Sequence, residues 1–167
     1  QGCKEAQGRI EHVLTKLGLK LHPQKTRRVM LTHGQEGFDF LGCHLHKRMS
    51  GRLWQQKGLR RYYLQNWPGR KAMNRVRERV RELTPRGRCH QDVRSVIAEL
   101  NAVLRGWGQY FQTGNAADHF TDVDAYVAKR LRSLRVQRAG RNLRSGQAQR
   151  WDRDYFESLG LHRLRGT

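Results

Sequence analysis

LNAVLRGWGQYF, at residues 100–111, is the stretch of this sequence that decides the fold. Its apolar residues continue a pattern that begins at Val93 and recurs at steps of three and four, which is the spacing of one buried face of an α-helix. The residues on this face are Val93, Val96, Ile97, Leu100, Val103, Leu104, Trp107, Tyr110 and Phe111. The pattern predicts a helix over about residues 92–112, with Trp107 and Tyr110 in the core.

A second helical pattern follows a turn at Gly114. Asn115 and Asp118 have the spacing of a capping box, in which two side chains satisfy free backbone groups at the start of a helix. The apolar residues that then recur at helical spacing are Phe120, Val123, Tyr126, Val127, Leu131 and Leu134. Gly106 and Gly108 lie inside the preceding helix, where they predict the close approach of another helix.

An arginine-rich helix is predicted before these two. Pro68 suits its first turn, where the missing N–H costs nothing, and Thr84 with Pro85 ends it. Its apolar stripe consists of Met73, Val76, Val80 and Leu83, and the cations between them are Arg70, Lys71, Arg75, Arg77, Arg79 and Arg81. Residues 68–140 are therefore predicted to form a three-helix bundle.

Residues 141–167 are predicted to be a basic tail. The first part of this tail is polar and carries no helical pattern. Its later apolar residues, Trp151, Tyr155, Phe156, Leu159 and Leu161, indicate one short helix that docks on the bundle.

The first 46 residues predict a helix and a β-hairpin. Residues 5–18 place apolar side chains on one helical face, and Gly18 is the kind of residue at which such a helix ends. Two β-branched and apolar runs, residues 29–32 and 38–45, flank a glycine-containing loop and predict paired strands. Residues 1–46 are expected to form this unit.

Residues 47–67 connect the two parts and are predicted to be a hinge. They contain a basic turn and short predicted strands at Leu53-Trp54 and at residues 61–64. Arginine and aromatic residues interleave at residues 60–63, where stacking on unpaired bases and strand packing are both open. The whole pattern predicts an α+β fold, in which a short helix and a hairpin precede a mainly helical bundle.

The chain is strongly basic throughout its length. It carries 34 Lys and Arg against 14 Asp and Glu, which is a formal charge of +20, and its pI is about 11.2. Residues 1–67 hold 13 basic and 4 acidic residues, and residues 68–167 hold 21 and 10, so the charge is not confined to one tail. This excess predicts a polyanionic partner, and the 26 Arg favour bidentate contacts with phosphate.

Two sets of residues resemble the C-terminal part of group II intron reverse transcriptases, which are also maturases. The pattern L-N-x-x-x-R-G-W-x-x-Y-F at residues 100–111, with F-x-x-x-D-x-Y-V at residues 120–127, resembles the maturase-specific domain (domain X, including the thumb). The patterns L-x-L-x-P-x-K-T at residues 19–26 and F-x-F-L-G at residues 38–42 resemble the end of the polymerase palm. The two resemblances follow each other in the family's order.

The resemblance implies a function for each part. Residues 1–46 would be the end of a palm, with Phe40, Leu41 and Gly42 as its primer grip, and residues 68–140 would be the thumb and domain X. The parent activity would be RNA-directed DNA synthesis with assisted intron splicing, using Mg²⁺ in the palm. This chain would be a fragment that lacks the fingers and the rest of the palm, needs no cofactor itself, and binds intron RNA or an RNA template–primer duplex in the cytoplasm.

The cations expected to contact RNA alternate with the apolar positions along each of the three helices. Too few acidic residues are present to neutralise these rows, so phosphate contacts are favoured over a merely solvated face. A-form RNA hides its base edges, so shape and phosphate are expected to dominate recognition. The predicted RNA-binding residues are Arg70, Lys71, Arg75, Arg79, Arg105, Lys129, Arg130 and Arg132.

No catalytic or metal site is predicted in this chain. A polymerase needs neighbouring carboxylates for its metal ions, but the sequence has no adjacent Asp pair, and Asp122 and Asp124 would point about 200° apart on a helix. The Cys and His residues at 43–46 and 89–90 lack the paired spacing of zinc sites. Three scattered cysteines indicate a reducing compartment, and no apolar run is long enough to cross a membrane.

Two other interpretations stay open at this point. The chain could be a basic protein that binds structured RNA and has no polymerase ancestry, which would leave the F-x-F-L-G pattern unexplained. It could also be the C-terminal part of another reverse transcriptase type, such as a retron enzyme. Such an enzyme would not be expected to carry the R-G-W-x-x-Y-F helix.

The helix at residues 92–112 yields a first test. Trp107→Ala should lower the free energy of unfolding by about 3–5 kcal/mol through lost packing. Arg105 lies beside the apolar stripe, so Arg105→Ala should leave the fold intact and weaken RNA binding by about 1–3 kcal/mol. Thermal melting and RNA titration of both variants check this. Melting of Arg105→Ala as early as Trp107→Ala would make Arg105 a structural residue instead.

Overall fold

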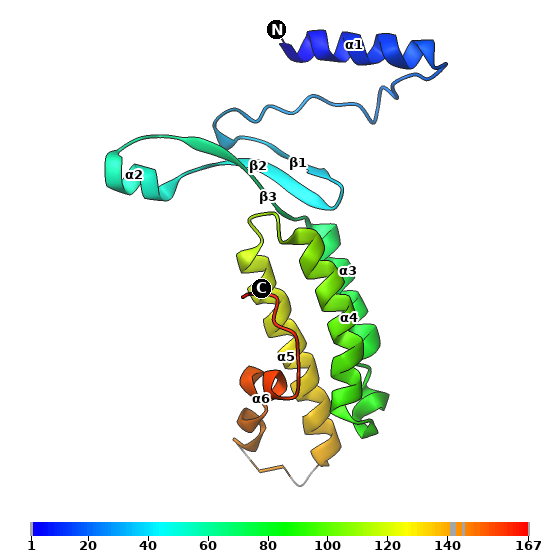
Figure 1. Ribbon diagram of the computed structural model, residues 1–167, viewed down its shortest axis with the longest axis vertical. Helices are drawn as coiled ribbons and strands as arrows, with labels where there is room; N and C mark the ends of the chain where they lie inside the picture. Colours follow the sequence, from blue (N-terminus) through cyan, green and yellow to red (C-terminus); the bar gives the residue numbers. More distant parts are fainter. Residues whose placement is uncertain (1, 141–142, 145, 167) are drawn as a thin grey trace. The chain divides into compact units, whose positions relative to one another are not determined.

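The computed structural model describes the chain except residues 1, 141–142, 145 and 167 (Figure 1). It divides into two compact units, residues 1–30 and 31–167. The first unit contains helix α1 (Gly2–Lys16), and Gly18 follows it with a left-handed φ of 70°, which confirms the predicted helix. None of the α1 side chains is buried within this unit. The strand predicted at residues 29–32 is wrong, because these residues form no strand.

A three-stranded antiparallel sheet begins the second unit. It consists of β1 (Gly37–Phe40), β2 (Cys43–Met49) and β3 (Tyr62–Pro68), in that order. The predicted single strand at residues 38–45 is wrong, because this segment folds back on itself between β1 and β2. Leu41 and Gly42 both have positive φ, 48° and 80°, and form a two-residue turn of the kind that matches the twist of a hairpin.

The segment at residues 47–67, predicted as a hinge, contains regular structure. Strand β2 continues to Met49, which pairs with Tyr62 at the start of β3. Helix α2 (Gly51–Lys57) connects the two strands, with the Ser50 hydroxyl accepting a hydrogen bond from the backbone at its start. The strand predicted at Leu53-Trp54 is therefore wrong, and a basic β-ribbon closed by a short helix occupies this place.

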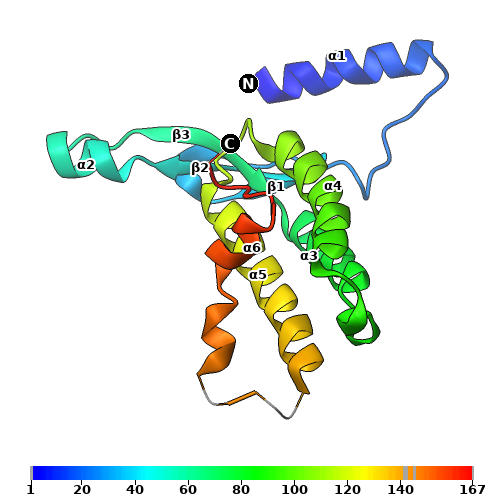
Figure 2. The ribbon, with the colours of Figure 1, turned by 60° about the horizontal axis from the view of Figure 1, so that its bottom comes forward.

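Three long helices follow, and Figure 2 shows them side by side. They are α3 (Arg70–Leu83), α4 (Val93–Phe111) and α5 (Ala117–Ala139), and α3 packs against both others. The Asp92 side chain caps α4, which confirms the predicted start of that helix. Pro68 is the last residue of β3 and not the first turn of α3, which begins after Gly69.

The capping box predicted for α5 is wrong. The residue before the helix is Ala116, and no side chain caps it. The Asn115 backbone N–H instead donates to the Asn66 carbonyl of β3, at 2.6 Å. Tertiary contact with the sheet therefore replaces the local cap that the sequence pattern indicates.

The core lies between the three helices. Its fully buried members include Val80 of α3, Leu100 and Leu104 of α4, and Val123 and Leu131 of α5. These residues are the predicted apolar stripes, so the helical part of the predicted α+β fold is confirmed.

Two aromatic residues of α4 differ in their burial. Trp107 is half-buried and packs against Phe111 and Phe120, with ring centroids 4.9 and 5.6 Å away. Tyr110 is 56% exposed, so its predicted place in the core is wrong. Its hydroxyl donates to the Leu41 carbonyl at 2.7 Å, because the hairpin turn lies against the last turn of α4.

The last part of the chain completes this core. A short 3-10 helix (Gln147–Arg150) and α6 (Arg153–Ser158) lead to a final segment in which Leu164 is buried. Trp151 and Phe156 are buried as well, which confirms the predicted docking helix. Residues 141–142, 145 and 167 of the predicted tail lie outside the described residues. No helix in the described part of the chain is long and apolar enough to span a membrane.

Two glycines test the junction between sheet and helices. A Cβ on Gly114 would lie 2.7 Å from the backbone oxygen of Asn66, whereas a Cβ on Gly106 would meet nothing within 4 Å. Gly114→Ala should therefore destabilise the fold by about 1–3 kcal/mol. Gly106→Ala should stabilise it by about 0.5–1 kcal/mol, because alanine favours a helix interior. Urea unfolding of both variants measures this, and equal effects would contradict the junction described here.

Candidate nucleic-acid interface

Helix α3 carries apolar residues on one side and cations on another. Met73, Val76 and Val80 are buried against the bundle. The predicted RNA-binding residues of this helix, which are Arg70, Lys71, Arg75 and Arg79, are all exposed. Arg79 pairs with Glu82 at 2.8 Å, but both side chains are more than half exposed, so this pair contributes little. Among the described residues the other three make no ion pair, so the face carries uncompensated positive charge.

Two further predicted cations are free to meet a ligand. Arg105 on α4 and Lys129 on α5 are exposed and have no ion-pair partner among the described residues. Arg105 directly follows the fully buried Leu104, so neighbouring residues of α4 lie on its core side and on its solvent side. The structure does not gather all the predicted cations on one element.

Arg130 and Arg132 have internal partners. The Arg130 guanidinium donates to the hydroxyl and the carbonyl of Thr84, which ties α5 to the end of α3. Arg132 donates from Nε to the Trp151 carbonyl at 2.8 Å and holds the segment before α6. Both side chains are half-buried. Their geometry is that of structural contacts, and we leave both residues out of the proposed RNA-binding set.

The hairpin turn presents the predicted primer-grip residues. Phe40 is 60% and Leu41 70% exposed, and Gly42 is exposed too. Beside this turn lies a cavity of about 500 Å³, whose lining includes Arg75 of α3 and Tyr110 of α4. The turn is fixed to the bundle by the Tyr110 hydrogen bond, so exposed apolar side chains are held beside a cation.

An ion pair links the 3-10 helix that follows α3 (Arg86–His90) to α4. Arg88 donates to the Glu99 carboxylate at 3.0 Å and to the Leu83 carbonyl at 2.9 Å. The hydrogen bond from Arg88 lowers the pKa of Glu99, and Glu99 raises the pKa of Arg88. Because the folded-state pKa of Glu99 is lowered, its contribution to stability is complete above the ordinary carboxyl pKa. That contribution is lost as the pH falls through the lowered value.

Two polar residues of the helical patterns hold the end of the chain, a role that the sequence analysis did not assign. Asn101 donates to the Gly160 carbonyl at 2.7 Å and accepts from the His162 N–H at 2.8 Å. The buried Asp124 accepts from the Leu164 and Arg165 N–H groups and pairs with Arg153 at 3.4 Å. The signal for this role is a polar residue within an apolar helical stripe.

Gly108 provides room for the same segment. A Cβ there would lie 2.6 Å from Leu164 Cδ2. The close neighbour of Gly108 is therefore the C-terminal segment, and a Cβ on Gly106 would meet nothing within 4 Å. The predicted approach of another helix to these two glycines is wrong.

No metal-binding group is found in the described part of the chain, where no three His, Cys, Asp or Glu side chains come together. Asp122 is exposed and Asp124 is committed to the C-terminal segment. The described cysteines are free thiols.

Residues 73–155 match the family model of the group II intron, maturase-specific domain. This region belongs to the group II intron maturase-specific domain family. The match covers about half of the chain and includes most of α3, all of α4 and α5, and the start of α6. It confirms the resemblance stated for the helical part, whereas the palm-like residues lie outside the matched range. A search of curated proteins found no matching relative.

Asp124 and Asp122 form a matched pair for testing the maturase-specific domain. Asp124→Ala removes an ion-pair partner of the Arg153 guanidinium and leaves two backbone N–H groups without their acceptor, so stability should fall by about 3–5 kcal/mol. Asp122→Ala removes an exposed carboxylate and should change stability by less than about 0.5 kcal/mol. Thermal melting with limited proteolysis after residue 150 measures both. Similar melting temperatures for the two variants would contradict the anchoring role of Asp124.

Proposed function

We propose that this chain binds structured RNA as the thumb and maturase portion of a group II intron reverse transcriptase. The ligand would be intron RNA or an RNA template–primer duplex. The exposed cation row of α3 is the observation that carries the proposal: Arg70, Lys71 and Arg75 follow one another on a helix whose other side is buried. Phosphates of an A-form helix are the ligands that such a row of guanidinium and ammonium groups suits.

The family match supports the intron as the source of the RNA. Residues 73–155 contain α4 and α5, whose cations Arg105 and Lys129 are exposed. A basic protein without polymerase ancestry would explain the charge but not this match. We therefore favour a maturase role in intron splicing and mobility, exercised in the cytoplasm.

The polymerase part of the proposal rests on the resemblance at the N-terminal end. Phe40, Leu41 and Gly42 would position a primer end beside α3, with the fingers and the rest of the palm of the same protein as partner. The chain itself has no adjacent Asp pair for metal ions. We expect it to bind RNA without incorporating nucleotides.

Salt dependence tests the proposed phosphate contacts. Each phosphate contact contributes about 0.7–0.9 to the slope of log affinity against log salt concentration. Replacing Arg75 and Arg79 together by Gln should make this slope shallower by about one to two units. Titrations of a structured RNA over a range of salt concentrations measure the slope, and circular dichroism checks the fold. An unchanged slope in a folded double variant would mean that these residues form only a solvated face.

A further inference from the structure

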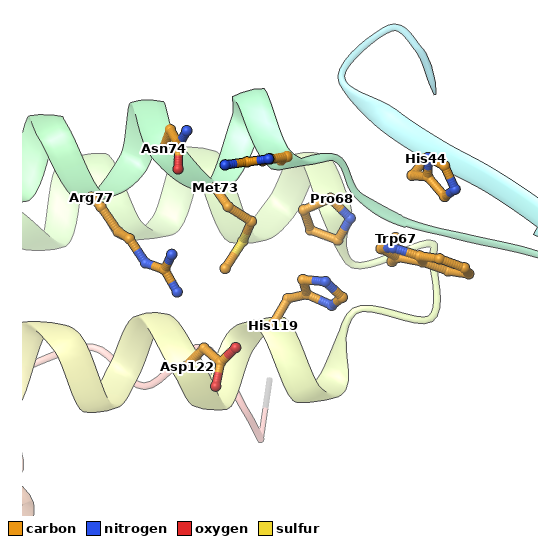
Figure 3. Close-up of a pocket in the computed structure, with 9 residues that line it drawn as sticks. His44, Trp67, Pro68, Met73, Asn74, Arg77, His119 and Asp122 are labelled. Carbon is orange, nitrogen blue, oxygen red and sulfur yellow. The ribbon is translucent and has the colours of Figure 1, made fainter. Parts of the chain in front are cut away.

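A cavity of about 590 Å³ lies where β3 meets the first turns of α3 and α5. Figure 3 shows Arg77 and Met73 of α3 directed toward His119 and Asp122 of α5 across this space, with Trp67 at its sheet end. Residues from the sheet and from two helices therefore line one hollow. None of them belongs to the predicted RNA-binding set except Arg70.

Aromatic rings form the sheet end of this cavity. The Trp67 indole is nearly parallel to the His119 imidazole, with an interplanar angle of 20° and centroids 6.5 Å apart. His44 lies 5.1 Å from Trp67 and is oriented by a 2.7 Å hydrogen bond to Asp39. Flat rings of this kind are the surfaces on which unpaired bases stack.

Two guanidinium groups line the helical part of the cavity. Arg70 and Arg77 lie about two turns apart on α3, and neither makes a hydrogen bond or an ion pair with any described residue. Arg77 is half-buried, so its charge lies partly out of water without a compensating anion. Asp122 lines the same cavity but does not pair with either arginine. A phosphate would satisfy these donors by bidentate contacts.

Polar side chains complete the lining. The Asn74 amide and the Asp122 carboxylate offer donors and acceptors in the same cavity. Base edges carry the matching acceptors and donors.

We propose that this cavity holds one unpaired nucleotide of the bound RNA. The base stacks on the Trp67 and His119 rings, and the phosphate binds Arg77 and Arg70. This inference rests on the proposed RNA binding and adds a base-recognising site to a surface that otherwise contacts phosphate. A free mononucleotide has the same chemistry, and the experiment separates the two sources.

The test compares two RNA hairpins, one fully paired and one with a single unpaired adenosine. Wild-type protein should bind the second about tenfold more tightly, the gain expected from one base–aromatic stack. His119→Ala and Arg77→Gln should reduce this preference to about one. Arg94→Gln is the matched control, because Arg94 is exposed at the start of α4 and lies outside the cavity. Placing 2-aminopurine at the unpaired position reports stacking directly, through quenching that His119→Ala should remove.

Each outcome has a distinct meaning. Equal affinity for the two hairpins, with salt-dependent binding retained, would overturn the cavity as a nucleotide site and leave the proposed RNA binding standing. If the wild-type protein binds neither hairpin, the proposed RNA binding itself is refuted. Adenosine 5′-monophosphate is the competitor. If it displaces the RNA at a concentration similar to that of the RNA, the cavity binds free nucleotides, and the proposal that it holds a nucleotide of the RNA is overturned. Circular dichroism of every variant separates these results from unfolding.

Discussion

Repulsion among 34 basic side chains is the constraint under which this chain folds. With 37% hydrophobic residues, the apolar side chains have to be concentrated in one place to offset it. The three long helices do this by turning their stripes toward a common seam, where Val80, Leu100 and Leu131 are fully buried. Cations between these stripes, such as Lys71, Arg75 and Arg105, are exposed, so the same folding event produces the core and a positive surface.

The C-terminal segment is part of that solution. Trp151, Phe156 and Leu164 add buried apolar side chains to the core between the helices. The Asp124 carboxylate of α5 holds this segment by hydrogen bonds. The cost of burying this carboxylate is offset by two backbone N–H groups and the Arg153 guanidinium. Some residues of the maturase-specific pattern therefore stabilise the fold, whereas others are exposed to solvent.

Helical periodicity predicted α3, α4, α5 and the docking helix α6, because burial of one face every three to four residues is a local property of the sequence. The errors arose where distant segments meet. Tyr110 carries the periodicity of a core residue, but its last helical turn meets the hairpin, so its hydroxyl bonds to Leu41. Asn115 satisfies the pattern of a cap, but β3 takes its N–H. The cavity at Trp67 could not be predicted from local patterns either, since two strands and two helices line it.

The structure gives α3 a central position in the proposed function. Its outward side carries the cation row proposed to bind phosphates, its first turns line the cavity with Arg70 and Arg77, and Arg75 lies beside the hairpin turn. One rigid helix would therefore place backbone contacts, an unpaired nucleotide and a primer end in fixed relation to one another. Such placement suits recognition of RNA by shape more than by base sequence.

Lysine acetylation of the RNA complex tests the central claim most directly, because Lys71 lies within the α3 cation row. The account predicts that bound RNA slows acetylation of Lys71 several-fold at low salt, and that this protection is lost at high salt, where phosphate contacts are screened. Acetylation of Lys71 at the same rate with and without saturating RNA would contradict the proposal that α3 faces the nucleic acid.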